Sequence, residues 1–345
     1  MRFFFTEEDH LTRVRGSEIR AALIHAGHEV QRGNPGQVAP AGVDVWMYGL
    51  GVAGAPPLTE AVERPLLHSS ATLVLFQLCD APSLSFERIS DALAQKTSLF
   101  LRNHWPSDES VAPSYRARLG FLPPMLKPMA ARPGAPLTER KIGSIFYGSR
   151  TGGANLGAAA NAREETVRLM RSSGLPFEGG LLPHSEARYH TSPELLVPRM
   201  NERAHGVRLM SSKLCLAPWG NHPLTYRLFE GLALRCLVVA QSLRESVFLD
   251  GGLEAGRHYV EVKADLSDLT STVDYYLNHL AEAQRIADAG HEHFSRYLAA
   301  RGKLVSAWLF DATVASWKGV YRPPEPLSPR RAMSSLLARL FPNRF

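Results

Sequence analysis

Residues 211–241 read SSKLCLAPWGNHPLTYRLFEGLALRCLVVAQ. Two short apolar runs, KLCLAP and CLVVA, flank a helical pattern over Leu224–Leu234, so the stretch predicts a strand, a turn, a helix and a second strand. Continuously apolar strands joined by a helix are typical of a parallel sheet that is covered on both faces. The stretch therefore predicts an α/β fold.

The predicted helix carries a charged pair, Arg227 and Glu230, whose three-residue spacing places both on one helical face. At about 100° per residue, the helix divides into a side with Arg227, Glu230, Gly231 and Leu234 and an apolar side with Leu228, Phe229, Leu232 and Ala233. We expect the apolar side to lie on the sheet, and the Arg, the Glu and a Gly without a side chain to face a cleft. A guanidinium suits phosphate and a carboxylate suits sugar hydroxyls. The alternative is that the pair forms a surface ion pair.

The loop before this helix adds candidates for binding an anion. Pro223 suits the first helical position, which leaves the N–H groups of the helix start available to a phosphate. Asn221 and His222 belong to the loop in front, and Tyr226 lies in the predicted first turn. We therefore count these three side chains among the candidate ligand-binding residues.

A second candidate loop follows the predicted strand Ile142–Tyr147. Its sequence, Gly-Ser-Arg-Thr-Gly-Gly, offers backbone N–H groups, the hydroxyls of Ser149 and Thr151, and the planar cation of Arg150. The turn has neither the Lys of a P-loop nor a GxGxxG spacing. A structural turn with a surface Arg is therefore the alternative to a phosphate site.

The same alternation of strands and helices extends along the chain, and a Pro-rich stretch at 105–137 divides it. We expect an N-terminal Rossmann-like domain over 1–137, completed by a helix at 303–321, and a ligand-binding domain over 138–302. Such sheets bind ligands beyond the carboxyl ends of their strands. A basic tail at 322–345 is expected either to dock as a helix or to lie on an anionic membrane surface.

Composition narrows the classes of partner. A net charge of +6 over 345 residues suits phosphorylated ligands or an acidic membrane face, and it lacks the charge density of a nucleic-acid binder. The N-terminal apolar run is only three Phe long, whereas a signal peptide needs about 7–15 apolar residues. No window offers the ~20 apolar residues of a membrane helix. We therefore expect a cytoplasmic protein with reduced cysteines. Its basic tail is compatible with binding to the inner face of the membrane.

A family resemblance rests on three sequence segments: FYGSRTGG at 146–153, RLFEGLALRCLVV at 227–239 and HYVEVKADLSDL at 258–269. Over roughly 142–298 they resemble the donor-binding half of GT-B-type glycosyltransferases, in particular the exostosin-like and CAP10-type families. The exostosin-like proteins keep the Arg-x-x-Glu helix in this form, whereas the CAP10 families do not.

The resemblance implies a GT-B architecture, in which two Rossmann-like domains face a cleft and the C-terminal one binds a nucleotide-sugar. Arg227 and Glu230 match the positions that cradle the donor, and Ser149, Arg150 and Thr151 match the turn at its diphosphate. It implies transfer to a saccharide or lipid-linked acceptor, in surface polysaccharide biosynthesis. No cofactor or metal is expected, since GT-B enzymes characteristically neutralise the diphosphate with protein groups.

An inverting transfer also needs a base at a strand end of the first domain, whereas a retaining transfer does not. Asp80, directly after a buried strand, is the favoured candidate, and His10 is the second; Asp9 and His104 occupy similar places. Two alternatives to a glycosyltransferase remain open, a non-catalytic nucleotide- or sugar-binding protein of the same fold and a GT-B-type epimerase.

Overall fold

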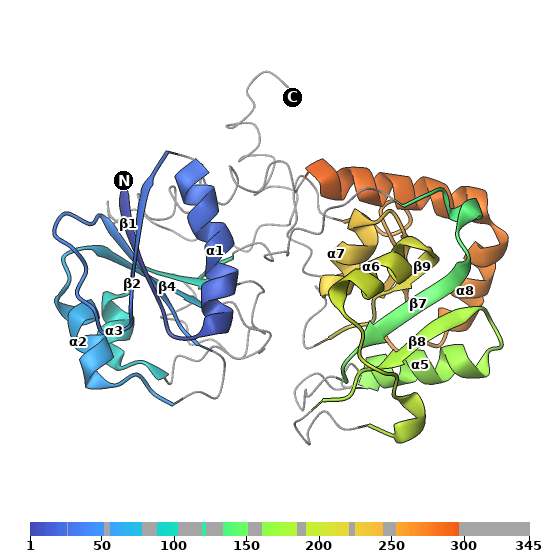
Figure 1. Ribbon diagram of the computed structural model, residues 1–345, viewed down its shortest axis with the longest axis horizontal. Helices are drawn as coiled ribbons and strands as arrows, with labels where there is room; N and C mark the ends of the chain where they lie inside the picture. Colours follow the sequence, from blue (N-terminus) through green and yellow to red (C-terminus); the bar gives the residue numbers. More distant parts are fainter. Residues whose placement is uncertain are drawn as a thin grey trace. The chain divides into compact units, whose positions relative to one another are not determined.

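A computed structural model of the chain describes residues 1–25, 27–51, 56–77, 88–102, 119–121, 134–150, 161–184, 191–220, 225–243 and 253–296. The chain forms two compact units, which divide at Met125 and Leu126 (Figure 1). Each unit contains one parallel β-sheet with its own core, and each is described by itself.

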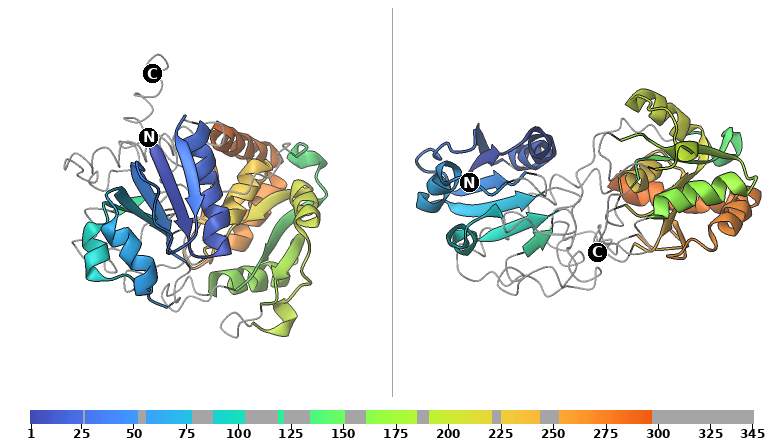
Figure 2. Two further views of the ribbon diagram at one scale, coloured as in Figure 1. Left: turned by 60° about the vertical axis from the view of Figure 1, so that its left-hand side comes forward. Right: turned by 90° about the horizontal axis from the view of Figure 1, so that it is seen from below.

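The sheet of the first unit is parallel throughout. In spatial order it contains β2 (Glu29–Gly33), β1 (Arg2–Glu7), β3 (Val45–Gly49), β4 (Thr72–Gln77), β5 (Leu99–Arg102) and β6 (Leu119–Phe121). Its helices are α1 (His10–His25), α2 (Glu60–His68) and α3 (Asp91–Lys96). Figure 2 shows α1 on one face of this sheet and α2 and α3 on the other.

The strand β1 explains why this sheet is covered on both faces. Successive side chains of a strand point to opposite faces, so its three consecutive Phe residues supply both cores. Phe3 and Phe5 join the cluster that includes Ile19 and Leu23 of α1. Phe4 joins the opposite cluster, which includes Leu66 of α2.

The second unit repeats the pattern with a sheet of five parallel strands. In spatial order they are β11 (Val260–Val262), β10 (Leu237–Gln241), β9 (Ser212–Leu216), β7 (Ile142–Gly148) and β8 (Phe177–Leu181). Its helices are α5 (Ala162–Ser172), α6 (Glu202–Met210), α7 (Tyr226–Ala233), α8 (Leu269–Asn278) and a helix over 280–296. The segments Leu137–Glu139 and Pro193–Leu195 form 3-10 turns.

The helices of the second unit divide between the two faces of its sheet (Figures 1 and 2). On one face, Leu209 of α6 and Leu234 after α7 pack with Tyr147 and the buried free cysteines Cys215 and Cys236. On the other face, apolar residues of α5, α8 and the helix over 280–296 form the larger core. The sequence led us to expect reduced cysteines, and these two are free thiols; Cys79 lies outside the described residues.

The strand orders define a switch point in each sheet, where successive connections turn to opposite sides. In the first unit β2 and β3 flank β1, and in the second unit β8 and β9 flank β7. Doubly wound sheets bind ligands beyond the carboxyl ends of the strands at such a point. We therefore expect ligand sites at the ends of β1 and β3 and at the ends of β7 and β9.

The expected α/β fold with two Rossmann-like units is confirmed. One expectation is wrong: the helix at the functional stretch begins at Tyr226, with Thr225 as its N-cap, so Pro223 does not occupy the first helical position. The edge strands β2 and β8 and the helix α6 are elements that the hydropathy pattern did not reveal. The segments 303–321 and 322–345 lie outside the described residues. Among the described residues, no helix is long and apolar enough to cross a bilayer.

Candidate functional site

The helix α7 lies at the switch point of the second unit because its apolar residues bury against β9 and β10. Leu228, Phe229 and Leu232 are buried. Gly231 is buried as well, which overturns the expectation that it faces a cleft beside Arg227. A Cβ on Gly231 would come within 2.7 Å of Val238 Cγ2 and 3.0 Å of Cys215 Sγ. This glycine therefore allows α7 to approach the sheet closely.

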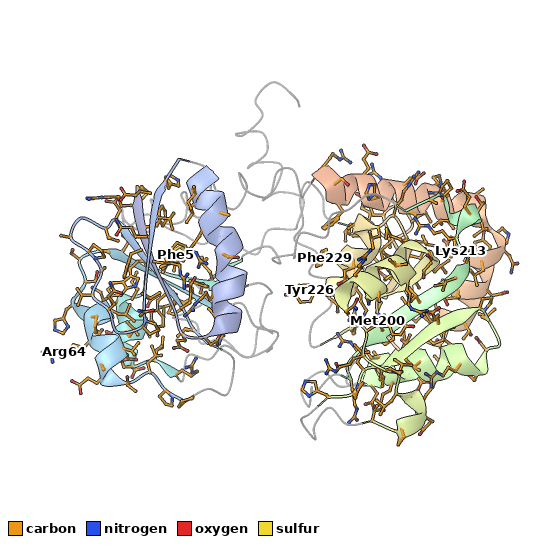
Figure 3. The ribbon with its side chains drawn as sticks, in the orientation of Figure 1. Phe5, Arg64, Met200, Lys213, Tyr226 and Phe229 are labelled. Atoms are coloured by element: carbon orange, nitrogen blue, oxygen red, sulfur yellow. The ribbon has the colours of Figure 1, made fainter. Side chains whose placement is uncertain are left out.

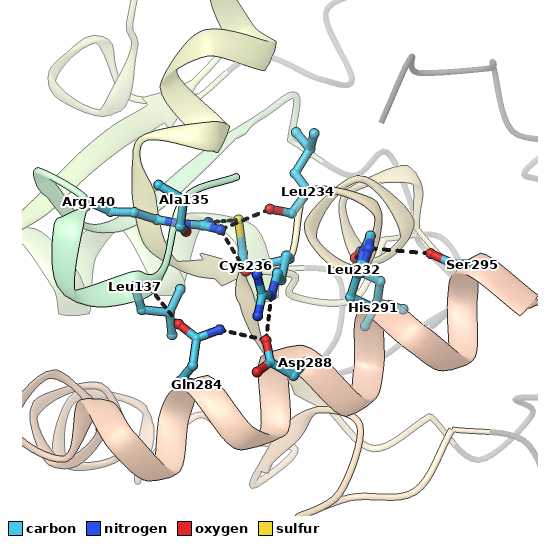
Figure 4. A network of polar contacts seen from close by, with 11 residues as sticks. Ala135, Leu137, Arg140, Leu232, Leu234, Cys236, Gln284, Asp288, His291 and Ser295 are labelled. Carbon is cyan, nitrogen blue, oxygen red and sulfur yellow. Dashed lines mark hydrogen bonds and ion pairs between the residues drawn. The ribbon is translucent and has the colours of Figure 1, made fainter. Parts of the chain in front are cut away.

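The C-terminal end of α7 is fixed by Arg140, whose guanidinium is buried (Figure 4). Its Nη2 donates to the carbonyls of Leu234 and Arg235, at 3.1 and 2.9 Å, and its Nη1 donates to Ser212 O at 2.8 Å and to Cys236 Sγ at 3.2 Å. A cation at this end satisfies carbonyl groups that the helix itself leaves unpaired.

The helix over 280–296 supports the same end of α7 (Figure 4). His291 Nδ1 lies 3.0 Å from the Leu232 carbonyl, and Arg235 forms an ion pair with Asp288. Gln284 donates to the same Asp288 carboxylate at 2.6 Å. The helix α7 is thus held on the sheet by packing and at its C-terminal end by polar contacts.

Arg227, in the first turn of α7, reaches the end of β7. Its Nε donates to the carbonyl of Tyr147, and its guanidinium lies where a side chain on Gly148 would be, because a Cβ there would be 2.6 Å from Nη2. The guanidinium carbon lies 5.2 Å from the centre of the Phe146 ring, within cation–π range. Burial lowers the pKa of Arg227, and the nearby Glu230 charge opposes that shift. Its two terminal nitrogens donate no hydrogen bond to any described residue.

Glu230 takes a different partner from the one that the spacing suggests. Within the described residues it forms no ion pair with Arg227; its Oε2 lies 3.5 Å from Nε2 of His205 on α6. Neither carboxylate oxygen accepts a hydrogen bond from a described residue, and 27% of the side chain is exposed. The surface ion pair offered as an alternative is therefore absent, and Glu230 keeps its capacity to accept hydrogen bonds.

The neighbours of His205 are fixed by a further polar chain. Asn201 caps α6 by accepting from Ala204 N at 2.8 Å, and one turn along the helix Arg208 pairs with Glu178 of β8. Tyr147 donates to the same Glu178 carboxylate at 2.8 Å. Burial and this hydrogen bond raise the pKa of Tyr147 to about 12, so the phenol stays protonated near neutral pH.

The turn after β7 is tied to the loop after β9. Arg163, in the first turn of α5, donates from Nη1 to Ser149 O at 2.8 Å, and its Nη2 occupies the space beside Gly220. Arg150 forms an ion pair with Glu164 at 2.8 Å through its Nε atom, so part of its guanidinium group already has a partner. Sequence reasoning missed Arg163, because nothing in a helical pattern shows that one arginine will span two loops.

The start of α7 presents two further groups. Thr225 is 6% exposed, its side chain makes no capping bond, and its buried hydroxyl has no hydrogen-bond partner among the described residues. Tyr226 is 42% exposed. Figure 3 places Tyr226 on one side of the unit and Lys213, at the start of β9, on the other. The N-terminal end of α7 thus lies towards the carboxyl ends of the strands.

The switch point of the first unit also holds charged groups. Glu8 accepts from Gly51 N at 2.7 Å and from Arg88 Nη2 at 2.8 Å. Asp9, one of the candidate bases, accepts from Thr12 N at 2.6 Å and so caps α1. His10 is the first residue of α1, and its side chain lies outside what the structure describes.

Several other candidates fall in segments outside the described residues. They are Asp80 and His104 among the proposed bases and Thr151, Asn221 and His222 among the proposed donor contacts. Of the predicted donor residues, the structure brings Ser149, Tyr226, Arg227 and Glu230 to the ends of β7 and β9, with Arg150 beside them. Within the described residues, no group of three or more His, Cys, Asp or Glu side chains could hold a metal ion.

Residues 186–302, about a third of the chain, match the family model described as "Glycosyl transferase-like", and this span contains β9, α7 and β10. Anabaena HepE, solved in complex with UDP-glucose, is 13% identical with a TM-score of 0.54, over 90% of this chain and 100% of that one. Sucrose-phosphate synthase from Thermosynechococcus elongatus is 10% identical with a TM-score of 0.53, over 92% and 100%. No curated protein sequence matches the chain significantly. At these identities the likeness shows the fold: the chain has the α/β architecture, with two Rossmann-like domains, of these GT-B-type structures.

Proposed function

We propose that this protein is a glycosyltransferase that binds a nucleotide-sugar donor at the switch point of its C-terminal unit. The observation that carries the proposal is the state of Arg227 and Glu230. Arg227 is held from behind by the Tyr147 carbonyl, and Glu230 lies beside His205; the terminal nitrogens of Arg227 and the carboxylate oxygens of Glu230 have no hydrogen-bond partner among the described residues. A fixed cation beside a fixed acceptor suits a diphosphate next to sugar hydroxyls.

Position and sequence family support the same proposal. The site lies where doubly wound sheets bind ligands, and α7 belongs to the span that matches the glycosyltransferase-like family. The unpaired Thr225 hydroxyl and the N–H groups at the start of α7 would add donors for a phosphate. Ser149, Arg150 and Tyr226, with Thr151, Asn221 and His222, remain proposed donor contacts.

The finer assignments are proposals as well. We place the enzyme near the exostosin-like and CAP10-type families, from the three sequence segments that resemble them, and infer a saccharide or lipid-linked acceptor in surface polysaccharide biosynthesis. Transfer would need no metal, because Arg227 and the start of α7 supply positive charge. Asp80 or His10 would act as base in an inverting reaction. The basic tail at 322–345 would hold the protein at the inner face of an anionic membrane.

Calorimetric titration with UDP and UDP-glucose tests the donor site; these probes are chosen because HepE was solved with UDP-glucose. Arg227→Met should weaken binding at least tenfold, since a charged hydrogen bond is worth about 1.5–3 kcal/mol. Arg168→Met, at an exposed position of α5, is the matched control and should bind like the wild type. Equal affinities of wild type and Arg227→Met would refute the site.

Catalysis is tested separately from binding. Incubation with UDP-glucose, and in parallel with GDP- and CDP-sugars, should release nucleoside diphosphate slowly without acceptor and faster with a saccharide acceptor. Binding without any release or transfer would instead identify the non-catalytic binding protein. Interconversion of the sugar while it stays attached to the nucleotide would identify the epimerase.

A further inference from the structure

His205 contacts the proposed donor site through a single side chain. It lies on α6, in a segment that showed no functional pattern in the sequence, and its Nε2 is 3.5 Å from Glu230 Oε2. We propose that His205 is a positioning residue, which holds the Glu230 carboxylate in the orientation that accepts a hydroxyl pair of the donor. This inference rests on the proposed function and deepens it.

The burial of Nε2 shows why the action of His205 is indirect. This atom is buried and makes no hydrogen bond with a described residue, so it does not face a ligand itself. Within the described residues, Glu230 is the polar side chain that it approaches. Glu230 is partly exposed, so any influence of His205 on a ligand passes through that carboxylate.

The chemistry of the contact assigns the proton. A lone pair on Nε2 would face the negative oxygen and be repelled, whereas an Nε2–H group is attracted to it. The Glu230 carboxylate therefore favours the form of His205 that carries hydrogen on Nε2. An N–H group held in place restrains the flexible Glu side chain, so that less conformational entropy is lost when a hydroxyl binds.

The ring itself is held by its surroundings. Tyr147 lies edge-on to His205, with ring centres 6.0 Å apart and an interplanar angle of 65°. The Tyr147 hydroxyl is fixed by Glu178, and Glu178 is paired with Arg208 on α6. The chain of contacts thus runs from β8 through β7 and α6 to the carboxylate oxygens of Glu230.

A double-mutant cycle tests whether His205 acts through Glu230. UDP and UDP-glucose affinities are measured for the wild type, Glu230→Gln, His205→Leu and the double variant. We expect Glu230→Gln to weaken binding by about tenfold or more and His205→Leu by about threefold to tenfold. In the Glu230→Gln background the His205→Leu change should have no further effect.

Two additional variants separate positioning from a merely structural role. His205→Gln keeps an N–H group near the place of Nε2 and should restore most of the affinity. Leu209→Ala removes a buried side chain of the same helix; it should lower stability while leaving the affinity of the folded protein unchanged. At saturating donor the rate of nucleotide release should be similar in His205→Leu and wild type, so that the change appears in KM.

The choice of ligand identifies which hydroxyls are recognised. A loss of affinity already seen with UDP assigns the recognised hydroxyls to the ribose. In that case 2′,3′-dideoxy-UDP, which lacks these hydroxyls, should bind the wild type, Glu230→Gln and His205→Leu with equal affinity. A loss seen only with UDP-glucose assigns the donor sugar. Both results support the positioning role, since both locate the effect at hydroxyls that Glu230 accepts.

The outcomes that overturn the inference differ from those that overturn the function. Wild-type protein that binds none of the UDP, GDP and CDP probes or their sugars refutes the donor site and the inference with it. Normal binding by wild type, weak binding by Glu230→Gln and unchanged binding by His205→Leu refute the positioning role alone. Independent, additive losses in the double variant would also refute it.

Discussion

The guanidinium of Arg227 occupies the space that a side chain on Gly148 would need. A Cβ at that glycine would lie 2.6 Å from Nη2 and 2.7 Å from Cζ, and the carbonyl of the preceding residue accepts from Nε. The end of β7 therefore has no side chain where the arginine crosses it. The position of the proposed phosphate-binding cation depends on a residue that need not touch the ligand.

Replacement of this glycine is expected to act on binding more than on folding. Gly148→Ala should displace the guanidinium and weaken UDP binding by about tenfold, because a charged hydrogen bond of about 1.5–3 kcal/mol would be misplaced. The far end of an arginine is flexible and Gly148 has no positive φ, so stability should change by less than about 1 kcal/mol. Titration calorimetry and urea unfolding measure the two effects.

Gly206 provides the control for that experiment. It lies inside α6, and nothing is within 4 Å of a Cβ placed there. Gly206→Ala should therefore stabilise the protein by about 0.5–1 kcal/mol and leave UDP affinity unchanged. An unaltered UDP affinity in Gly148→Ala would show that the bare strand end is not needed.

Gly231→Ala is expected to act on folding more than on UDP binding. The added methyl would meet Val238 Cγ2 at 2.7 Å and both Cβ and Sγ of Cys215 at 3.0 Å, which forces α7 away from the sheet. Overpacking of this kind costs about 1–3 kcal/mol, measurable by urea unfolding. A second change, Val238→Ala, should recover part of that loss; a double variant no more stable than Gly231→Ala would contradict the proposed collision.

Arg140→Met tests the polar support of α7. The substitution removes the buried donor from the carbonyls of Arg235 and Ser212, and from that of Leu234, which still accepts from Gly134 N at 3.2 Å. Because an unsatisfied buried group costs about 1–3 kcal/mol, the free energy of unfolding should fall by at least about 2 kcal/mol. The exposed Arg168→Met should change it by less than about 0.5 kcal/mol. Similar stabilities of the two variants would mean that water replaces the guanidinium.

Acid stability should depend on His293, in the helix over 280–296. Burial, followed by the charges of His258, Arg296 and Arg257, lowers the pKa of His293 to about 4, with Glu254 opposing. Since the unfolded residue titrates near 6.5, its neutral form contributes stability that is complete above about pH 6.5 and is lost as pH falls towards 4. The loss amounts to at most about 3 kcal/mol.

The variant His293→Phe should flatten this part of the stability profile, because phenylalanine keeps a ring beside His258 without a proton to gain. The ring centres of the two histidines are 4.5 Å apart. Urea unfolding at pH 7, 5.5 and 4.5 measures the slope, with the exposed His279→Gln as control. A profile as steep as that of the wild type would assign acid sensitivity to other groups.

The sequence by itself determined the α/β class and the interior strands of both units. Runs such as FFF in β1 and LVVA in β10 are apolar at successive positions, and only a strand covered on both faces uses that pattern. The edge strands EVQRG and FEGGL escaped detection, because an edge strand pairs on one side only and tolerates polar residues and glycine. Helical spacing also singled out Arg227 and Glu230 correctly as neighbours on one surface.

Only the tertiary structure decided what those two residues contact. Their spacing left an ion pair between them open as the alternative to a ligand site, but the fold brings Gly148 from β7 to Arg227 and His205 from α6 to Glu230. It also buries Gly231, because α7 packs closely on β9 and β10 at that residue. Local spacing fixes which face of a helix a residue occupies, whereas its partners come from segments far away in sequence. Those partners are set by strand order and by close packing, which periodicity does not encode.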